Sequence, residues 1–495
     1  MSTLLIPIQQ PLQPKLPTIE GNVDYNTLRE QLARIDELVV SSGIEEQAIT
    51  ESFEAWKARS KFENISPKTQ RKIQLHARRA FRCNIARTLM MEDYRDFSIR
   101  LADSPLFQSF CCLVEIDRVQ VPAKSTLQRY SQWSEVELVD KLINRLTQQG
   151  HLNCQKLGLQ DPLDLQSAYL DSTCVKANIH YPVDWVLLRD GTRTLMKRVI
   201  LIRAQGLRHR MEAPQEFIRR MNILCIQMTH ARGEKESKKQ RKKLLRKMDK
   251  LIDQVAKHAK RYRQILEQDW EKTEWTRGQT DYMLRGLDNI LDQLPQARRQ
   301  ARERIIKEKQ VPSQEKILSL YDPDVQVIVR KKAGAEVEFG NSLLLSESQQ
   351  GVILDWQLFQ DMAPNDSRLT PETLERTEEN LDIHIEAVAG DRAFDSQSNA
   401  KLLNERNTYN GLCPRDPKEL KERKKSWKFK RLQRRRAQSE GRIGIMKNKF
   451  LGRPLRSKGF KSRQLAVGWA VLTHNLWVMA RLAQPEEEEE KRPAA

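Results

Sequence analysis

The sequence predicts an α/β protein in which a large helical insertion interrupts a mixed sheet and an all-helical domain precedes it. Three observations lead to this prediction. Residues 24–150 repeat apolar side chains at helical spacing. Residues 193–310 keep a helical pattern for more than a hundred positions, with few residues that break helices. Short apolar runs of strand character stand on both sides of that block.

The N-terminal region contains two helices with recognisable starts. A first helix is expected over residues 24–39, where four leucine and isoleucine residues recur at helical spacing. A second begins at Ser66-Pro67 and runs to about Met91, because Ser is a favoured N-cap and Pro is tolerated in the first turn.

A third helix of this region is expected to open at Ser125. Ser125 and Gln128 have the spacing of a capping box, and a break at Val121-Pro122 comes before them. A short helix, a turn and a capped helix that carries Lys124, Gln128 and Arg129 near its start are compatible with a helix-turn-helix, which makes these three residues candidate DNA contacts. A helical packing or dimerisation domain fits the pattern equally well.

The sheet is expected from six strand-like runs. They are 168–175, 325–330, 339–346, 352–359, 383–389 and 409–413. Helices over 371–381 and 395–406 separate the later runs, and one long basic helix is expected over 427–450. Strand, hairpin, helix, strand, helix, strand, helix is the order of a ribonuclease-H-like mixed sheet, provided that residues 193–310 are an insertion after its first strand.

The chain is strongly basic, and the positive charge is concentrated in two stretches. It has 86 Lys and Arg against 66 Asp and Glu, a formal net charge of +20. Residues 232–263 hold fourteen Lys or Arg against four acids, and residues 415–463 hold twenty against four. The first stretch has apolar residues along one side and is typical of a solvated helix face. A polyanion such as double-stranded DNA is the partner that this balance indicates.

Other features argue against secreted, zinc-binding and membrane proteins. The seven cysteines include no CxxC pair, so reduced thiols and no zinc site are expected. The first residues lack the basic and apolar regions of a signal peptide. The apolar run 465–483 is interrupted by Thr473, His474 and Asn475 and predicts a buried helix. We therefore expect a cytoplasmic protein associated with the nucleoid.

Three acidic residues stand where such a sheet could bring them together. Asp171 lies in the first strand, Asp391 directly follows an apolar strand, and Glu440 lies on the helix that closes the set. Three carboxylates from separate elements are a minimal set of ligands for two hard divalent cations. Spacing alone does not select them, since an Asp at a strand end is more often a turn residue and a Glu in a basic helix more often an ion-pair partner.

Two segments around the aspartates resemble those of bacterial insertion-sequence DDE transposases. Residues 390–396, which read Gly-Asp-Arg-Ala-Phe-Asp-Ser, together with Asn399 resemble the second-aspartate motif, in which Ala393 takes the place of the usual Gly. Residues 170–184, with Asp171 near their start, look like the first-aspartate segment.

The third acid lies in a similar context. Arg436-x3-Glu440-x6-Lys447 resembles the Arg, Glu and Lys of the Tyr-x2-Arg-x3-Glu-x6-Lys signature of the same family, with Gln433 at the Tyr position. The resemblance implies that Asp171, Asp391 and Glu440 bind Mg²⁺ or Mn²⁺, two ions in all. It also implies that Arg436 and Lys447 contact phosphates beside the scissile bond. On one continuous helix these three residues would share a face.

The resemblance implies a transposase that binds the terminal inverted repeats of its element and catalyses metal-dependent strand cleavage and strand transfer. Two element ends must be held together, so a homodimer on DNA is expected. Three alternatives remain: a non-catalytic DNA-binding protein such as a decayed transposase or repressor, an RNA-binding or packaging protein, and a nuclease without strand transfer.

The expected domains follow from these assignments. They are a disordered N-terminus over 1–22, a helical DNA-binding or dimerisation domain over 23–160, a ribonuclease-H-like catalytic domain over 161–192 and 311–483, the helical insertion over 193–310, and a disordered acidic tail over 484–495.

Overall fold

A computed structural model describes residues 16–22, 24–60, 65–231, 237–332 and 335–482. The chain divides into two compact units, which are described separately below. Unit 1 comprises residues 1–175, 342–359 and 363–495, and unit 2 comprises residues 176–341 and 360–362. The acidic tail predicted over 484–495 and most of the N-terminus predicted as disordered lie outside the described residues.

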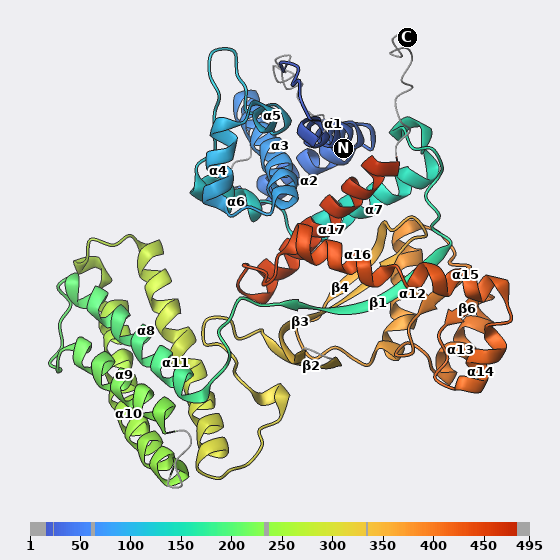
Figure 1. Cartoon of the computed structure of the whole chain (residues 1–495). Coiled ribbons are helices and arrows are strands. Elements are labelled where there is room, and N and C mark those ends of the chain that lie inside the picture. Colours follow the sequence, from blue (N-terminus) through green and yellow to red (C-terminus); the bar gives the residue numbers. More distant parts are fainter. Residues whose placement is uncertain (1–15, 23, 61–64, 232–236, 333–334, 483–495) are drawn as a thin grey trace. The chain divides into compact units, whose positions relative to one another are not determined.

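Unit 2 is built around four long helices, which Figure 1 shows packed along one another. They are α8 (Asp184–Ala204), α9 (Pro214–His230), α10 (Ser237–Asp269) and α11 (Arg277–Ile305). Short 3-10 turns follow α10 at Trp270–Lys272 (η2) and α11 at Ser313–Glu315 (η3). In the described part of 193–310 no residue belongs to a strand.

Helix α10 combines a buried apolar side with a charged exposed side. Leu245, Met248, Ile252 and Val255 are fully buried in the core that the four helices share. The lysines and arginines of its basic stretch therefore lie mostly on the solvent side, as the sequence pattern predicts. The helical block begins at Asp184, earlier than the predicted boundary at 193, because α8 continues without a break across that position.

Among its described residues, the part of unit 1 that precedes the first strand consists of helices and loops, with an isolated bridge between Val114 and Val119. Its helices are α1 (Asp24–Ser41), α2 (Ile44–Arg59), α3 (Pro67–Met90), α4 (Tyr94–Asp103), α5 (Pro105–Phe110), α6 (Lys124–Ser131), α7 (Val136–Leu152) and the 3-10 turn η1 (Gln155–Leu157). They share one large apolar core with the C-terminal helix and with part of the sheet.

Of the two predicted helix starts with a capping residue, one is confirmed and one is wrong. The Ser66 side chain accepts a hydrogen bond from the Thr69 N–H and caps α3 as expected. Helix α6 instead begins at Lys124, with Ala123 at its N-cap and no side-chain cap. Ser125 thus lies inside the first turn, where its hydroxyl cannot act as the N-cap. The N-cap position is held by Ala123, whose side chain has no oxygen atom to accept a hydrogen bond, so the expected capping box is not formed.

The strands form one mixed sheet of order β2-β3-β1-β5-β6, in which β4 also pairs with β3. They are β1 (Ser167–Lys176), β2 (Gln326–Lys332), β3 (Ala335–Glu347), β4 (Ile353–Leu358), β5 (Ala387–Gly390) and β6 (Tyr409–Leu412). Strand β3 is antiparallel to β2 and β4, whereas β5 is parallel to β1 and to β6. All six predicted strands are present, but β5 is shorter than the predicted run 383–389.

Helices α12 (Asp366–Leu381) and α13 (Gln397–Glu405) precede β5 and β6 respectively. Helix α12 begins five residues before the predicted start at Pro371. Pro371 lies inside the helix and does not end it. The segments after β6 are α14 (Pro417–Arg423), α15 (Trp427–Arg436), α16 (Ser439–Met446), the π-helical turn η4 (Lys447–Leu451) and α17 (Phe460–Leu482).

The predicted long helix over 427–450 is wrong. The α-helical pattern stops at Arg436, and Ala437 and Gln438 form a turn in which the Gln438 N–H bonds to the Arg435 carbonyl three residues back. A second α-helical segment then gives way to the π-helical turn at Lys447. Arg436, Glu440 and Lys447 therefore stand on three successive segments, and the argument that one helix face aligns them does not hold.

Helix α17 fills the core of unit 1. It lies beside α7 in Figure 1, and its residues from Val467 to Met479 are buried, Thr473, His474 and Asn475 among them. The Asn475 side chain exchanges two hydrogen bonds with the backbone of Ile353 in β4, so the polar residues that interrupt the apolar run tie the helix to the sheet. Among the described residues, no helix is long and apolar enough to cross a membrane.

Candidate active site

Asp171 lies in β1, and Asp391 directly follows the neighbouring parallel strand β5. Strands β1 and β5 pair with Tyr169 opposite Ala389, and each aspartate comes two residues later. The parallel register therefore brings the two residues to the same edge of the sheet, and the charge of Asp391 acts on the Asp171 carboxylate. The two residues are 220 positions apart in the sequence, and the parallel pairing alone brings them together.

The electrostatics of Asp171 reflect this proximity. Burial and then the negative charge of Asp391 raise the pKa of Asp171 to about 6. The Ser172 N–H, which donates to the Asp171 carboxylate over 2.8 Å, and the cationic Arg436 act in the opposite direction. A carboxylate whose pKa is raised by burial and by a neighbouring negative charge lies where a bound cation would be favourable.

The loop after β5 holds Asp391 in place. The Asp391 carboxylate accepts a hydrogen bond from the Ala393 N–H at 2.8 Å, and Phe394 is fully buried below the loop. The buried side chain of Asn399 donates to the carbonyl oxygens of Phe394 and Ser367, both at 2.8 Å. Asn399 thereby joins this loop to the start of α12. The residues around the second aspartate thus serve to fix its backbone.

A fourth acid lies next to this pair. The Ser172 hydroxyl donates to the Asp366 carboxylate at 3.0 Å, and Asp366 is the first residue of α12. A carboxylate at a helix N-terminus is stabilised by the helix dipole. Asp366 is thereby tied to β1 through Ser172, the residue after Asp171, and no sequence motif had pointed to it.

Arg436 approaches the aspartates from α15. Its positive charge lowers the pKa of Asp171, so the guanidinium lies within electrostatic reach of that carboxylate. Its Nε atom is buried and has no hydrogen-bond partner in the part of the chain that the structure describes, which carries an energetic cost.

The neighbouring Arg435 has a different role, although the sequence presents Arg434, Arg435 and Arg436 as one basic run. Arg435 is 5% exposed and pairs with the buried Glu347 at 3.1 Å. It also donates to the carbonyl oxygens of Ser348 and Gln349, both at 2.7 Å, and its guanidinium lies over the Tyr169 ring. Arg435 therefore anchors α15 to the end of β3 and to β1.

Gln433 makes a second anchor between α15 and the sheet. Its side-chain amide donates to the carbonyl oxygens of Gly411, at 2.6 Å, and of Gly390, at 3.2 Å. These glycines belong to β6 and β5, and Gly390 directly precedes Asp391. A Cβ at Gly411 would approach the Val388 carbonyl oxygen to 2.7 Å, so the close strand spacing there requires glycine. Gln433 thus holds the helix that carries Arg436 against the strand that carries Asp391.

Glu440 is exposed in the first turn of α16, and no hydrogen bond or ion pair of its carboxylate is present among the described residues. The helix itself is fixed, because Ser439 and Arg442 on either side bond to Glu347 and to the Gln350 carbonyl. Lys447 is partly buried at the start of η4. No group of three or more acidic, His or Cys side chains in the described ranges is arranged to hold a metal ion.

The remaining candidate DNA contacts, Lys124, Gln128 and Arg129, lie on the exposed side of α6 in the N-terminal helices. The structure brings together only some of the predicted residues, and Glu440 and Lys447 lie on the later segments α16 and η4. Asp171, Asp391 and Arg436 are electrostatic neighbours, while the three α6 residues belong to a separate surface.

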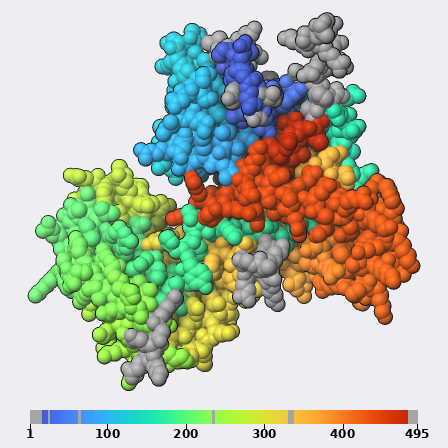
Figure 2. Space-filling model, in the orientation of Figure 1, coloured from blue at the N-terminus to red at the C-terminus, as the bar shows by residue number. Residues whose placement is uncertain are grey.

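Sequence reasoning missed Arg435, Gln433 and Glu347. A signal for Arg435 was present within α15, because the apolar residues Phe429 and Leu432 are buried and Arg435 continues their helical spacing. Figure 2 shows the C-terminal segment, drawn in orange to red, over part of the visible face of unit 1.

Comparison with known proteins supports a transposase function. Residues 326–476 match the family model described as a transposase DDE domain. The match contains Asp391, Arg436, Glu440 and Lys447, while Asp171 lies before it. No curated protein and no solved structure matches the chain.

Proposed function

We propose that this protein is a DDE transposase that cleaves and joins DNA at the ends of its own mobile element. The observation that carries this proposal is the register of Asp171 and Asp391, which come two residues after a paired position on adjacent parallel strands. It is independent of the family match, because Asp171 lies outside the matched residues.

The sheet supports a ribonuclease-H-like catalytic domain. Strands β4, β3, β1, β5 and β6 lie in that spatial order, with an antiparallel hairpin on one side and parallel strands on the other. The four helices of unit 2 enter the chain between β1 and β2, which agrees with a helical insertion after the first strand. The boundaries 161–192, 193–310 and 311–483 remain predictions.

The acidic residues fit a hard divalent cation. Asp171 and Asp391 offer carboxylate oxygens at one edge of the sheet, and their mutual repulsion would be relieved by Mg²⁺ or Mn²⁺. Glu440 would supply the third carboxylate, from a side chain that is exposed and has no protein partner among the described residues. A bound divalent cation would supply charge stabilisation at the reacting phosphate.

The cationic residues beside the acids fit a DNA phosphate. Arg436 offers a buried Nε–H that has no protein acceptor among the described residues, close to Asp171. A guanidinium binds a phosphate through directed hydrogen bonds and would position the scissile bond. Lys447 would contact a neighbouring phosphate. Lys124, Gln128 and Arg129 would bind the element end at a distinct surface, and a homodimer would hold two ends together.

The test is cleavage of DNA that carries the terminal inverted repeats of the element. We expect Mg²⁺-dependent nicking at the repeat end, which Asp391→Asn abolishes while binding in Ca²⁺ is retained. Asp395→Asn, a matched change four residues later, should leave nicking within a few-fold of the wild-type rate. Repeat-specific binding without nicking under any divalent cation would instead indicate a non-catalytic DNA-binding protein. Strand transfer would be read from joined products in the same reactions.

A further inference from the structure

The N-terminal helices of unit 1 contain two adjoining pockets that the catalytic proposal does not use. One, of about 390 Å³, is lined by residues from α2 and from the end of α6, among them Trp56, Arg59 and Trp133. The other, of about 470 Å³, is lined by residues of α3 and α6, including His76 and Tyr130. Both volumes are typical of sites for small planar groups.

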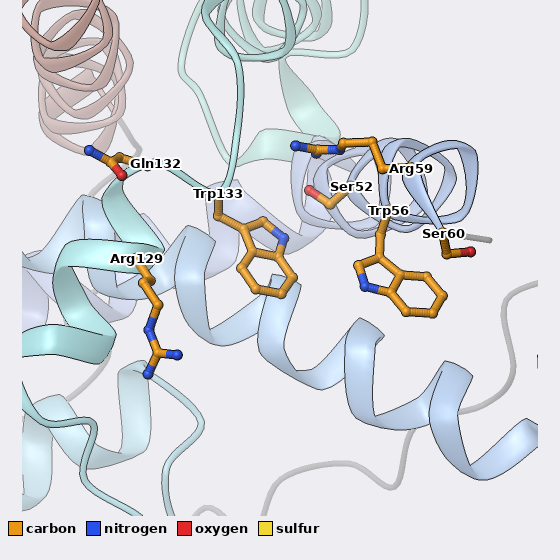
Figure 3. Close-up of a pocket in the computed structure, with 7 residues that line it drawn as sticks. All are labelled: Ser52, Trp56, Arg59, Ser60, Arg129, Gln132 and Trp133. Carbon is orange, nitrogen blue, oxygen red and sulfur yellow. The ribbon is translucent and has the colours of Figure 1, made fainter. Parts of the chain in front are cut away.

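The two pockets share Arg129 and Trp133. In Figure 3 the Trp133 indole lies between the Arg129 side chain and the Trp56 indole. Trp56 lies on α2, Arg129 on α6 and Trp133 just after α6, and α3 packs against both helices. Trp133 thus forms a wall common to both pockets. Its indole and that of Trp56 are both partly exposed, so their faces are open to a ligand.

Two neighbouring aromatic side chains hold the Trp133 indole in place. Tyr130 packs edge-on against Trp133 with ring centroids 6.2 Å apart, and His76 lies 6.3 Å from the same indole. The His76 Nδ1 and the Tyr130 hydroxyl are hydrogen-bonded at 3.0 Å. Tyr130 is 4% exposed. A preorganised aromatic wall loses little side-chain entropy when a ring stacks on it.

The surroundings of the pockets are positive. Neither pocket is lined by a carboxylate in the described part of the chain, whereas Arg59, Arg79 and Arg129 line one or both. After burial itself, the charges of Arg79, Lys72 and Arg129 lower the pKa of His76, which places its ring in a positive field. Aromatic faces combined with guanidinium groups suit a group that is planar and attached to a phosphate.

We propose that the pockets on either side of Trp133 bind unpaired bases of a DNA strand, which stack on Trp133 and Trp56 while Arg59 and Arg129 contact the flanking phosphates. A base inside a duplex exposes only its edges, so an aromatic wall can recognise a base only after it leaves the stack. The exposed polar face of α6, with Lys124 and Gln128, adjoins Arg129 and would bind the neighbouring backbone. That the ligand is DNA rests on the proposed function.

The experiment measures the affinity of the full-length protein for three labelled duplexes in Ca²⁺, at one salt concentration. One duplex is fully paired, one has a single unpaired adenine, and one has an abasic residue at the same position. We expect the wild-type protein to bind the unpaired adenine more tightly than either control duplex. Trp133→Ala should lose roughly 5- to 150-fold in affinity for that duplex, the range for one stacked base, and little for the other two.

Two further variants measure the contribution of the indoles to binding even if Trp133→Ala unfolds. Trp133→Phe should retain most of the preference, because a smaller ring still offers a face, and Trp56→Ala should weaken it by removing the second indole. Tyr282→Ala is the matched control, since Tyr282 is a 64% exposed aromatic residue beside Arg198 in unit 2 and lines neither pocket. It should leave all three affinities unchanged.

Three outcomes would overturn the proposal. One is an equal loss on all three duplexes for Trp133→Ala and Trp56→Ala, which would make both residues structural. Another is a wild-type protein that does not distinguish the unpaired adenine from the abasic residue. The third is displacement of the duplex by free deoxyadenosine monophosphate at equal concentration, which would indicate a site for a free nucleotide. A protein that prefers the unpaired base but never nicks DNA would support these pockets and contradict the proposed enzymatic activity.

Discussion

The carboxylate of Asp391 adds to the effect of burial in raising the pKa of Asp171, although the two residues are 220 positions apart in the chain. The parallel pairing of β1 and β5 brings them close. Burial is the larger of the two causes of the raised pKa. Two measurable consequences follow, one for the pH dependence of stability and one for the effect of divalent cations.

Asp171→Asn should stabilise the cation-free protein at alkaline pH. The pKa of Asp171 is raised to about 6 in the folded chain, so the folded state holds this proton more tightly than the unfolded state. The stabilisation is present at low pH and is lost as the pH rises through about 6. At pH 8 the Asn variant should thus be more stable by about 1–3 kcal/mol, the upper value corresponding to two pKa units without solvent screening. Urea denaturation in EDTA at pH 4 and pH 8 measures the difference.

Divalent cations should make the wild-type protein more stable than Asp171→Asn. Mg²⁺ at millimolar concentration should raise the midpoint of wild-type unfolding, because a cation that binds only the folded state stabilises it. The Asn variant should respond much less. Asp395→Asn serves as the control and should respond as the wild type does. Equal effects of Mg²⁺ on the wild type and on Asp171→Asn would remove Asp171 from the cation site.

Arg435→Met should destabilise the protein far more than Arg434→Ala. Removing the Arg435 charge leaves Glu347, which is 3% exposed, buried and unpaired. Loss of one partner of a buried ion pair costs about 3–5 kcal/mol, whereas changes at an exposed residue such as Arg434 are usually within about 0.5 kcal/mol. Urea denaturation measures both. The double variant Arg435→Met/Glu347→Leu should recover most of the stability, and a double variant as unstable as the single one would contradict the ion-pair explanation.

These residues illustrate which parts of the fold the sequence could predict. Apolar periodicity located the six strands and the helical character of residues 193–310, because each depends on local patterning. The break of the predicted helix 427–450 could not be found in this way. The residues of that turn are compatible with a helix, and the break is fixed by distant partners of Arg435 and Ser439 on the β3–β4 connection. Tertiary contacts there override local preference.

The candidate site also contains residues that the sequence could predict and residues that only the structure reveals. Family motifs selected Asp171, Asp391 and Arg436, which the structure makes electrostatic neighbours. Residues that only position the site have no motif of their own. Gln433 stood out as a departure from the Tyr of the signature, and only the structure connects its amide to the Gly390 and Gly411 carbonyl oxygens. Asp366 was hidden because its proximity to Ser172 depends on how α12 packs on the sheet.

DNA binding should depend strongly on salt, and Arg436 and Lys447 should account for part of that dependence. Each phosphate that the protein neutralises contributes roughly 0.9 to the slope of log affinity against log salt. Replacing both residues with Gln should therefore reduce the slope by about 2 if each contacts a phosphate. Replacing Lys401 and Lys428 is the control for a simple loss of two positive charges. Fluorescence anisotropy between about 50 and 200 mM salt measures the slopes, and an unchanged slope for the first pair would return both residues to ordinary surface charge.

Glu440→Gln should abolish DNA cleavage and preserve binding to the element ends. The substitution keeps the shape of the side chain and removes the negative charge that a hard cation requires. Because Glu440 is exposed and has no ion pair among the described residues, its loss should leave the stability of the protein within about 0.5 kcal/mol. Loss of activity could then not be assigned to unfolding.

The matched control is Glu422→Gln, which alters an exposed carboxylate of α14 that pairs with Lys425 at 2.7 Å. Mg²⁺-dependent nicking of a labelled end fragment, measured beside a gel-shift assay in Ca²⁺, separates chemistry from binding. Near-wild-type nicking by Glu440→Gln would exclude this residue as the third acid.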